Sequence, residues 1–73
     1  MEMLGLRKIR KARGYSKLQV AMKLNISREA LSYYETGKRS PDIEMLVALS
    51  DFYGVSIDYL ILGRETVHPP AKL

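Results

Sequence analysis

The sequence predicts an all-α fold, a single small domain of five short helices. Its 73 residues leave room for only one hydrophobic core. Apolar residues recur at helical spacing, and no segment shows the sustained alternation of a strand. The chain also lacks the Asn-Gly and Asp-Gly pairs that mark tight hairpins. The residues expected to end the helices are Gly14, Asn25, Gly37, Gly54 and Gly63.

The first helix is expected around Leu6 and Ile9, with basic residues on its other sides, and it should end at the first of these glycines. The second helix begins at Ser16, which forms a capping-box pattern with Gln19. Asn25 ends it, because asparagine is among the few non-glycine residues that accept a left-handed backbone.

The third helix begins at Ser27 and runs to Gly37, so the turn before it is very short. A loop then leads to the fourth helix. Either Ser40 followed by Pro41, or Asp42, caps that helix, and the sequence leaves the choice open.

The last helix is expected over Ile57 to Leu62, with Ser56 as its cap. We therefore expect residues 1–63 to form the domain. Residues 64–73, which contain two consecutive prolines, are expected to be a short mobile tail.

Charge is distributed unevenly along the chain. Residues 7–39 carry ten Lys and Arg against two Glu, a net charge of +8, whereas residues 40–73 carry two basic against five acidic residues, a net charge of −3. With Glu2, the whole chain has a net charge of +4. This division suggests a polyanionic partner on one side of the molecule, although a solvated basic helix face is the simpler alternative.

Composition excludes several classes of protein. The absence of cysteine rules out disulfides and cysteine-ligated metal sites. No apolar run approaches the roughly 18 residues that span a bilayer, and the N-terminus is too basic for a secretory signal. No nucleophile–base pair, phosphate-binding loop or zinc-protease motif is present. We expect a cytoplasmic protein without catalytic activity, cofactor or metal.

Two helices joined by a tight turn within the basic half have the dimensions of a DNA-binding helix-turn-helix. Residues 6–63 resemble the phage-repressor/Cro type of helix-turn-helix, the xenobiotic-response-element family of bacterial and phage transcriptional regulators. The segments that carry the resemblance are Ser27-Arg28, Tyr34 to Pro41 and Gly54 to Leu60. The resemblance implies a compact five-helix bundle of the lambda-repressor-like DNA-binding type.

Helical phase places several polar side chains on one face of the third helix, opposite Leu31. A recognition helix needs such a face, because side chains read base edges in the major groove. Arg28 can donate to guanine and Glu29 can accept from cytosine. In an isolated helix both residues would be explained as an ordinary exposed first turn. The expected base-reading residues are Arg28, Glu29, Ser32 and Tyr33.

Phosphate contacts are expected on both sides of this helix. The N-terminus of the second helix would direct backbone amides and an ammonium group at one phosphate. Many members of the family carry Gln where Lys17 stands; lysine adds a full charge but lacks the two-sided geometry of an amide. The family's pattern implies the contacts on the other side. The expected phosphate-binding residues are Ser16, Lys17, Ser27, Thr36, Lys38 and Arg39.

The resemblance also implies a structural ion pair between Arg10 on the first helix and Glu35 on the third. Leu18 and Met22 lie off the inward face of the second helix. We expect them to pack under the first helix, and a surface for a protein partner is the alternative.

The expected function is sequence-specific binding of double-stranded DNA by a transcriptional regulator, in the form of a repressor that binds a palindromic operator as a homodimer. The last helix carries more apolar side chains than so short a helix is expected to bury. The expected dimer contact is Ile57, Leu60, Ile61 and Leu62. An antitoxin-like protein-interaction module with secondary DNA binding is the alternative. A basic protein of membrane surfaces is disfavoured, because the apolar faces converge on one core.

Overall fold

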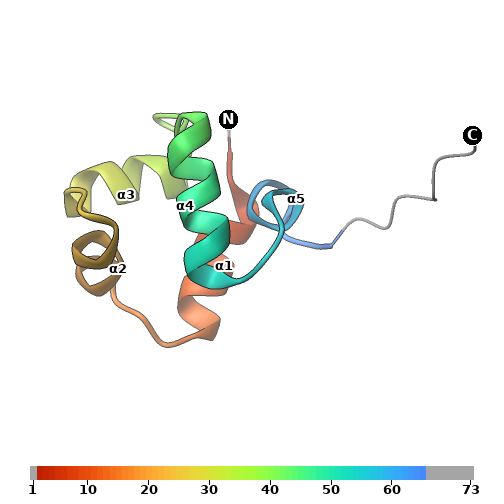
Figure 1. Ribbon diagram of the computed structural model, residues 1–73, viewed down its shortest axis with the longest axis horizontal. Coiled ribbons are helices and arrows are strands. Elements are labelled where there is room, and N and C mark those ends of the chain that lie inside the picture. The colour runs from red at the N-terminus through yellow and green to blue at the C-terminus, as the bar shows by residue number, and fades with distance from the viewer. Residues whose placement is uncertain (1, 66–73) are drawn as a thin grey trace, which may run out of the picture.

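The computed structural model describes residues 2–65, and all regular secondary structure in this part of the chain is helical (Figure 1). The predicted all-α fold of five helices is confirmed. Residues 66–73, most of the expected tail, lie outside the described residues. The helices are α1 (Leu4–Ala12), α2 (Lys17–Leu24), α3 (Arg28–Thr36), α4 (Ile43–Tyr53) and α5 (Ile57–Leu62).

Side-chain caps begin four of the helices. Ser16 and Gln19 form the reciprocal capping box at α2, in which each side chain accepts the other residue's backbone N–H. Ser27 and Ser56 cap α3 and α5. At α4 the structure decides between the two alternatives, because Asp42 accepts the N–H of the third helical residue.

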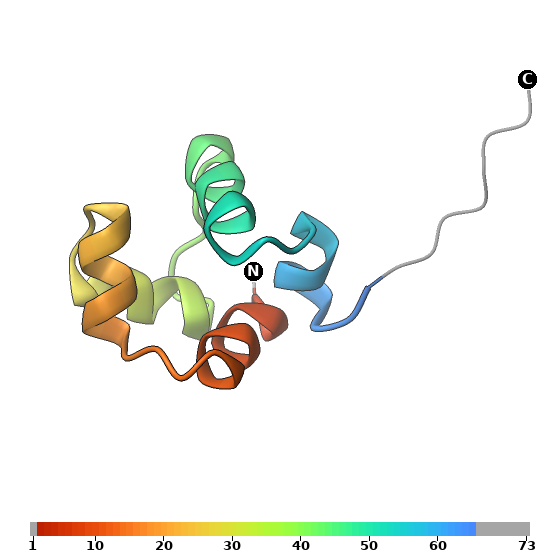
Figure 2. The same ribbon diagram turned by 60° about the horizontal axis from the view of Figure 1, so that its bottom comes forward.

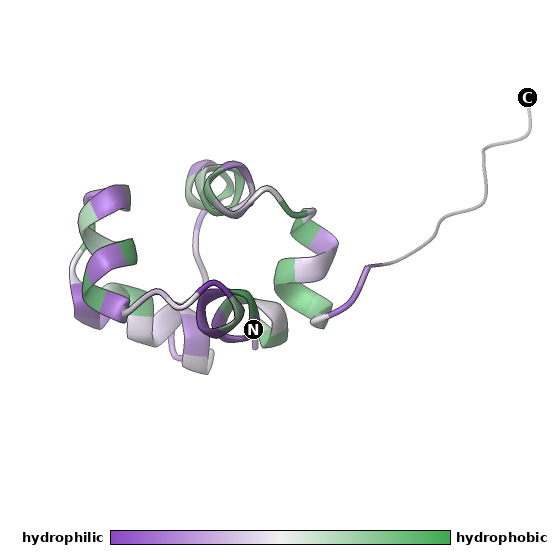
Figure 3. Cartoon of the chain, turned by 90° about the horizontal axis from the view of Figure 1, so that it is seen from below, coloured by the Kyte–Doolittle hydropathy of each residue, from purple (hydrophilic) through white to green (hydrophobic). Residues whose placement is uncertain are grey.

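The middle of the molecule consists of α1 and α4, with the α2–α3 pair at one end and α5 at the other (Figure 2). Hydrophilic and apolar residues alternate around α1, whereas apolar residues dominate α5 (Figure 3). The buried core draws on all five helices and on the segment before α1. Its residues are Met3, Leu6, Ile9, Val20, Leu31, Leu49, Tyr53 and Leu60.

The expectation that Leu18 and Met22 pack under the first helix is wrong. Their exposed fractions are 55% and 72%. The physical reason is the arrangement of the helices: α1 packs chiefly against α5 and α3, while α2 packs against α3 through its other face. Among the described residues, no helix is long and apolar enough to cross a membrane.

The backbones of α1 and α5 approach each other closely at Gly5. A Cβ atom at this position would overlap the backbone carbonyl oxygen of Tyr59. Beside this contact, the ammonium of Lys8 donates a hydrogen bond of 3.0 Å to the carbonyl of Gly63, just after α5 ends. The missing side chain of Gly5 therefore allows α5 to lie directly on the first turn of α1.

A buried ion pair joins α1 to α3. Arg10 Nε lies 2.7 Å from Glu35 Oε2, and Arg10 Nη2 lies 3.1 Å from Oε1, so the contact is bidentate. Only 9% of the Arg10 side chain and 1% of the Glu35 side chain are exposed. The remaining Nη1 donates to the carbonyl of Tyr15, in the loop before α2. One guanidinium thus holds α3 and the α1–α2 loop against α1.

Tyr53 on α4 is buried in the same region. Burial raises the pKa of its phenol to about 12, and the negative charge of Glu35 acts in the same direction. Its hydroxyl has no hydrogen-bond partner within residues 2–65. The phenol therefore stays neutral at ordinary pH and adds no charge to the neighbouring ion pair.

We predict that Gly5→Ala destabilises the protein by at least about 2 kcal/mol, because the new methyl group forces α5 away from α1. Gly14→Ala is the matched control: its φ is +73° but its Cβ would meet open space. That control should lose only about 1–2 kcal/mol, the cost of a left-handed alanine. Urea unfolding followed by circular dichroism measures both. An equal loss in the two variants would contradict the close contact between α1 and α5.

We predict that Glu35→Ala costs about 3–5 kcal/mol, because it leaves the Arg10 guanidinium buried without its counter-charge. The double variant Arg10→Met with Glu35→Leu removes both charges and keeps similar volumes. It should be more stable than either of its single variants, Arg10→Met and Glu35→Leu. Equilibrium unfolding of the wild type, these two single variants and the double variant forms a double-mutant cycle that tests this, and additive losses would show that the pair is not coupled.

Candidate nucleic-acid interface

The turn between α2 and α3 is formed by a left-handed residue. Asn25 has φ 56° and ψ 44°, as its position at the end of the helix predicted. The next amide, of Ile26, donates a hydrogen bond of 3.0 Å back to the carbonyl of Ala21. The turn is thereby fixed to the end of α2, and it is short enough to set the relative orientation of the two helices.

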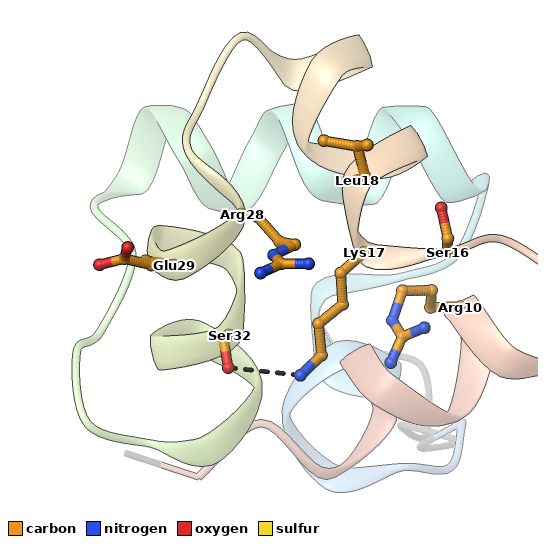
Figure 4. Close-up of a pocket in the computed structure, with 7 residues that line it drawn as sticks. All are labelled: Arg10, Ser16, Lys17, Leu18, Arg28, Glu29 and Ser32. Carbon is orange, nitrogen blue, oxygen red and sulfur yellow. Dashed lines mark hydrogen bonds between the residues drawn. The ribbon is translucent and has the colours of Figure 1, made fainter.

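An open hollow of about 490 Å³ lies where α2, α3 and α1 meet (Figure 4). Five of the residues that line it are ones for which the sequence predicted contacts with DNA, so residues far apart in the sequence share one surface. The lining residues are Arg10, Ser16, Lys17, Leu18, Arg28, Glu29 and Ser32.

The hollow has an excess of positive charge. Glu35 compensates Arg10, whereas the Arg28 side chain has no hydrogen bond or ion pair to any residue of 2–65. In Figure 4, Glu29 extends away from Lys17 and Arg28. The side facing α2 therefore carries the unpaired guanidinium and an ammonium, and both are suited to bind an electron-rich acceptor.

Lys17 crosses from α2 to α3. Its side chain is half-buried, and its ammonium donates a hydrogen bond of 3.4 Å to Ser32 Oγ (Figure 4). The ammonium is thus placed beside the second turn of α3. It adds a positive charge where α3 itself has only a short hydroxyl.

The serine caps leave donors for a further partner. The hydroxyl oxygens of Ser16 and Ser27 accept backbone N–H groups at 3.1 Å and 3.0 Å, and each O–H proton remains able to donate. Thr36 differs, because its hydroxyl already donates to the carbonyl of Ser32 at 2.9 Å. To bind a phosphate oxygen as a donor, Thr36 has to give up that bond.

Tyr33 is linked to the loop that follows α3. The ammonium of Lys38 lies 5.5 Å from the centroid of its ring, within the range of a cation–π contact. The backbone amide of Arg39 donates to the Tyr33 carbonyl at 3.3 Å. The side chains of Lys38 and Arg39 are exposed. The two basic residues therefore lie next to α3 and on the surface.

The expected dimer contact requires one correction. Leu60 is fully buried in the core of its own chain and therefore cannot form part of an exposed contact. Ile57 and Ile61 are half-buried, and 42% of Leu62 is exposed. The short length of the last helix suggested that it could not bury all of its apolar side chains. It buries Leu60 because the contact at Gly5 brings α1 directly against α5.

Sequence reasoning missed a second hollow, of about 440 Å³, on the other side of α2. It lies between α2 and the end of α4, and the rings of Tyr15 and Phe52 meet there at 5.6 Å between centroids. Its formation depends on how α2 and α4 pack, for which the local pattern holds no signal. The lining residues are Tyr15, Gln19, Met22, Lys23 and Phe52.

Known proteins share this arrangement. The helix-turn-helix family of the Cro/C1 type matches residues 6–60. The HTH-type transcriptional regulator ImmR of Bacillus subtilis (strain 168) is 45% identical over 62 residues, which cover 85% of this chain and 48% of ImmR. The HTH-type transcriptional activator BcrR of Enterococcus faecalis is 37% identical over 62 residues, covering 85% of this chain and 30% of BcrR.

A crystal structure of a transcriptional regulator from Listeria innocua has the same fold, with a TM-score of 0.71 and 27% sequence identity. The match covers 96% of this chain and 68% of that one. This chain spans about half the length of ImmR and less than a third of BcrR. Because the family match covers α2, the turn and α3 together with most of the remaining helices, the chain belongs to the Cro/C1-type helix-turn-helix family of DNA-binding transcriptional regulators.

Proposed function

We propose that this protein is a transcriptional repressor that binds a palindromic operator in double-stranded DNA as a homodimer, with α3 in the major groove. The observation that carries the proposal is the positively charged hollow between α2 and α3, in which the exposed Arg28 has no partner among residues 2–65. An exposed cation beside a recognition helix matches the way such helices read base edges.

The base-reading residues in this proposal lie on the first two turns of α3. Arg28 donates two hydrogen bonds to O6 and N7 of a guanine, and Glu29 accepts from N4 of a cytosine. Ser32 and Tyr33 face the neighbouring base pairs. The cation–π contact with Lys38 limits the motion of the Tyr33 ring, so its placement depends on the loop after α3.

Phosphate groups are bound on both sides of α3. On one side, Ser16 and the first amides of α2 donate to a phosphate. On the other side, Ser27, Lys38 and Arg39 do so, and Thr36 joins them once it releases the Ser32 carbonyl. Because the phosphate backbone is the same at every sequence, these contacts supply affinity and set the position of α3 without selecting bases.

The proposed repressor role requires only that the domain bind its operator. A repressor has only to occupy its operator, whereas an activator must also contact the transcription machinery. BcrR is named an activator, so a relative of this chain acts in the other direction. A reporter gene placed behind the operator distinguishes the two roles: this protein should lower its expression.

The homodimer follows from the limited reach of one recognition helix. A single helix reads only a few base pairs, and a twofold-related copy doubles the number read, with half-sites about 34 Å apart. The proposed contact is the apolar surface of Ile57, Ile61 and Leu62. Leu4 is 59% exposed and extends this surface, because it lies beside Gly63 at the end of α5.

An antitoxin-like module is the second candidate, and the hollow beside Met22 favours it. That hollow is mainly apolar and lies on the side of α2 away from α3. Co-purification of a stoichiometric protein partner that Met22→Glu abolishes would support this candidate over the repressor.

Selection from a random DNA library tests the proposal. We expect the wild-type protein to select a palindrome with two half-sites. Arg28→Ala should lose the preference at one base pair per half-site, at a cost of about 1–3 kcal/mol there. Lys38→Ala should keep the same motif and bind every sequence more weakly, because it removes only a phosphate contact.

Two results would count against these assignments. An unchanged motif after Arg28→Ala would remove Arg28 from the base-reading residues. Failure of the wild-type protein to enrich any sequence at low salt would reject sequence-specific DNA binding altogether.

We predict that Leu62→Glu makes the protein monomeric, because it places a charge on the apolar dimer surface. Ile43→Glu is the matched control, since Ile43 is 79% exposed and lies on α4 outside the proposed contact. It should leave the dimer intact. Sedimentation equilibrium measures the mass of both variants. A wild-type protein that is monomeric both alone and on operator DNA would overturn the dimer.

A further inference from the structure

We propose that Lys17, acting together with Ser32, reads a guanine in the major groove instead of binding a phosphate. The proposal rests on the DNA binding proposed above and deepens it, because it adds a specificity-determining residue that lies outside the recognition helix. It also replaces the phosphate contact that the sequence predicted for Lys17.

The direction of the side chain carries the argument. A phosphate at the start of α2 would lie beyond the helix end, next to the amides of its first turn. Lys17 extends instead across the hollow and places its ammonium 3.4 Å from Ser32 Oγ on α3 (Figure 4). Ser32 lies one helical turn after Arg28, on the same face of α3. The ammonium is therefore beside the surface that would enter the groove.

The length of the side chains explains why Lys17 matters there. Arg28 is long enough to reach a base edge from the first turn of α3, whereas serine is short. The Ser32 side chain is too short to reach a base edge, and the Lys17 side chain, whose ammonium lies beside it, is long enough to do so. The phosphate at the start of α2 keeps its ligands, because the hydroxyl proton of Ser16 and the first amides of the helix remain available.

The hydrogen-bonding chemistry of the pair selects the base. An ammonium has three donors and no acceptor, and two of its protons remain after the bond to Ser32. The Ser32 oxygen accepts from Lys17, and its own proton is free to donate. The pair thus presents donors. Guanine offers two acceptors, N7 and O6, in the major groove, while adenine adds a donor and cytosine offers only a donor there.

The charges around Lys17 also favour recognition of a guanine. The Lys17 ammonium shares its hollow with the guanidinium groups of Arg10 and Arg28, and within residues 2–65 only the Arg10 side chain of these three has a carboxylate partner. Two cations without counter-charges on one surface are stabilised by acceptor-rich base edges. The expected half-site therefore contains two guanines, one read by Arg28 and a nearby one read by the Lys17–Ser32 pair.

Library selection with Lys17→Ala, Lys17→Gln and Ser32→Ala tests this inference. We expect Lys17→Ala and Ser32→Ala to lose the guanine preference at one and the same base pair, while the base pair read by Arg28 is unchanged. Lys17→Gln, which adds an acceptor, should shift that preference towards adenine. The matched control is Lys23→Ala, since Lys23 lies at the other end of α2 and lines the second hollow. It should leave the motif unchanged.

A modified base gives a second, independent readout. Replacing that guanine by 7-deazaguanine removes the N7 acceptor and keeps the base pair. Wild-type affinity for the modified operator should fall about 5- to 150-fold, the range of one base contact. The affinity of Lys17→Ala should not change on the same replacement. Circular dichroism melting confirms that each variant is folded.

The outcomes separate this inference from the proposed function. If Lys17→Ala weakens binding to all sequences equally and keeps the motif, Lys17 binds a phosphate; the inference is then wrong and the DNA-binding function stands. If the two single variants alter different base pairs, the pair does not act together and the inference also fails. If the wild-type protein binds no DNA, both proposals fall.

Discussion

The buried ion pair between Arg10 and Glu35 is the constraint on which the arrangement of the helices depends. Its two hydrogen bonds fix α3 against α1, and the third donor of the guanidinium holds the Tyr15 carbonyl in the loop before α2. A buried charge without its partner is costly, so α3 has little freedom to rotate or slide. The contact with α1 therefore fixes the orientation of α3 within the fold.

The same pair determines the charge of the proposed DNA-binding surface. Arg10 lines the hollow between α2 and α3, but Glu35 compensates its charge, so Lys17 and Arg28 supply the positive charge that faces outward. The helix caps serve both folding and proposed binding. The hydroxyl oxygens of Ser16 and Ser27 accept backbone N–H groups at the helix starts, and their hydroxyl protons remain able to donate to DNA. In each cap the hydroxyl oxygen stabilises the helix, and the hydroxyl proton is the group that would bind a partner.

Much of this architecture could be predicted from the sequence, because its signals are local. Caps, left-handed stop residues and the short turn act within a few residues, and the predicted ends of α2–α5 were found where expected, while α1 ends at Arg13, one residue before the predicted Gly14. The exposed Leu18, the buried Leu60 and the contact at Gly5 could not be predicted, since they depend on how helices far apart in the sequence pack. The direction of the Lys17 side chain could not be predicted either. The sequence predicted that Lys17 lies on α2, but not that its ammonium contacts Ser32 on α3.

The division of charge along the chain also affects how the molecule is oriented during its diffusional encounter with a charged partner. The basic residues belong mostly to α1–α3, while residues 42–65 carry five acidic side chains against one arginine. Four basic residues lie on α1, and Asp42, Glu44 and Asp51 lie on α4 and its cap. Since α1 and α4 lie on opposite sides of the middle of the molecule (Figure 2), the protein has an electric dipole across its width. Near a polyanion such a dipole turns the basic side forward, so collisions are oriented and the association rate rises at low ionic strength.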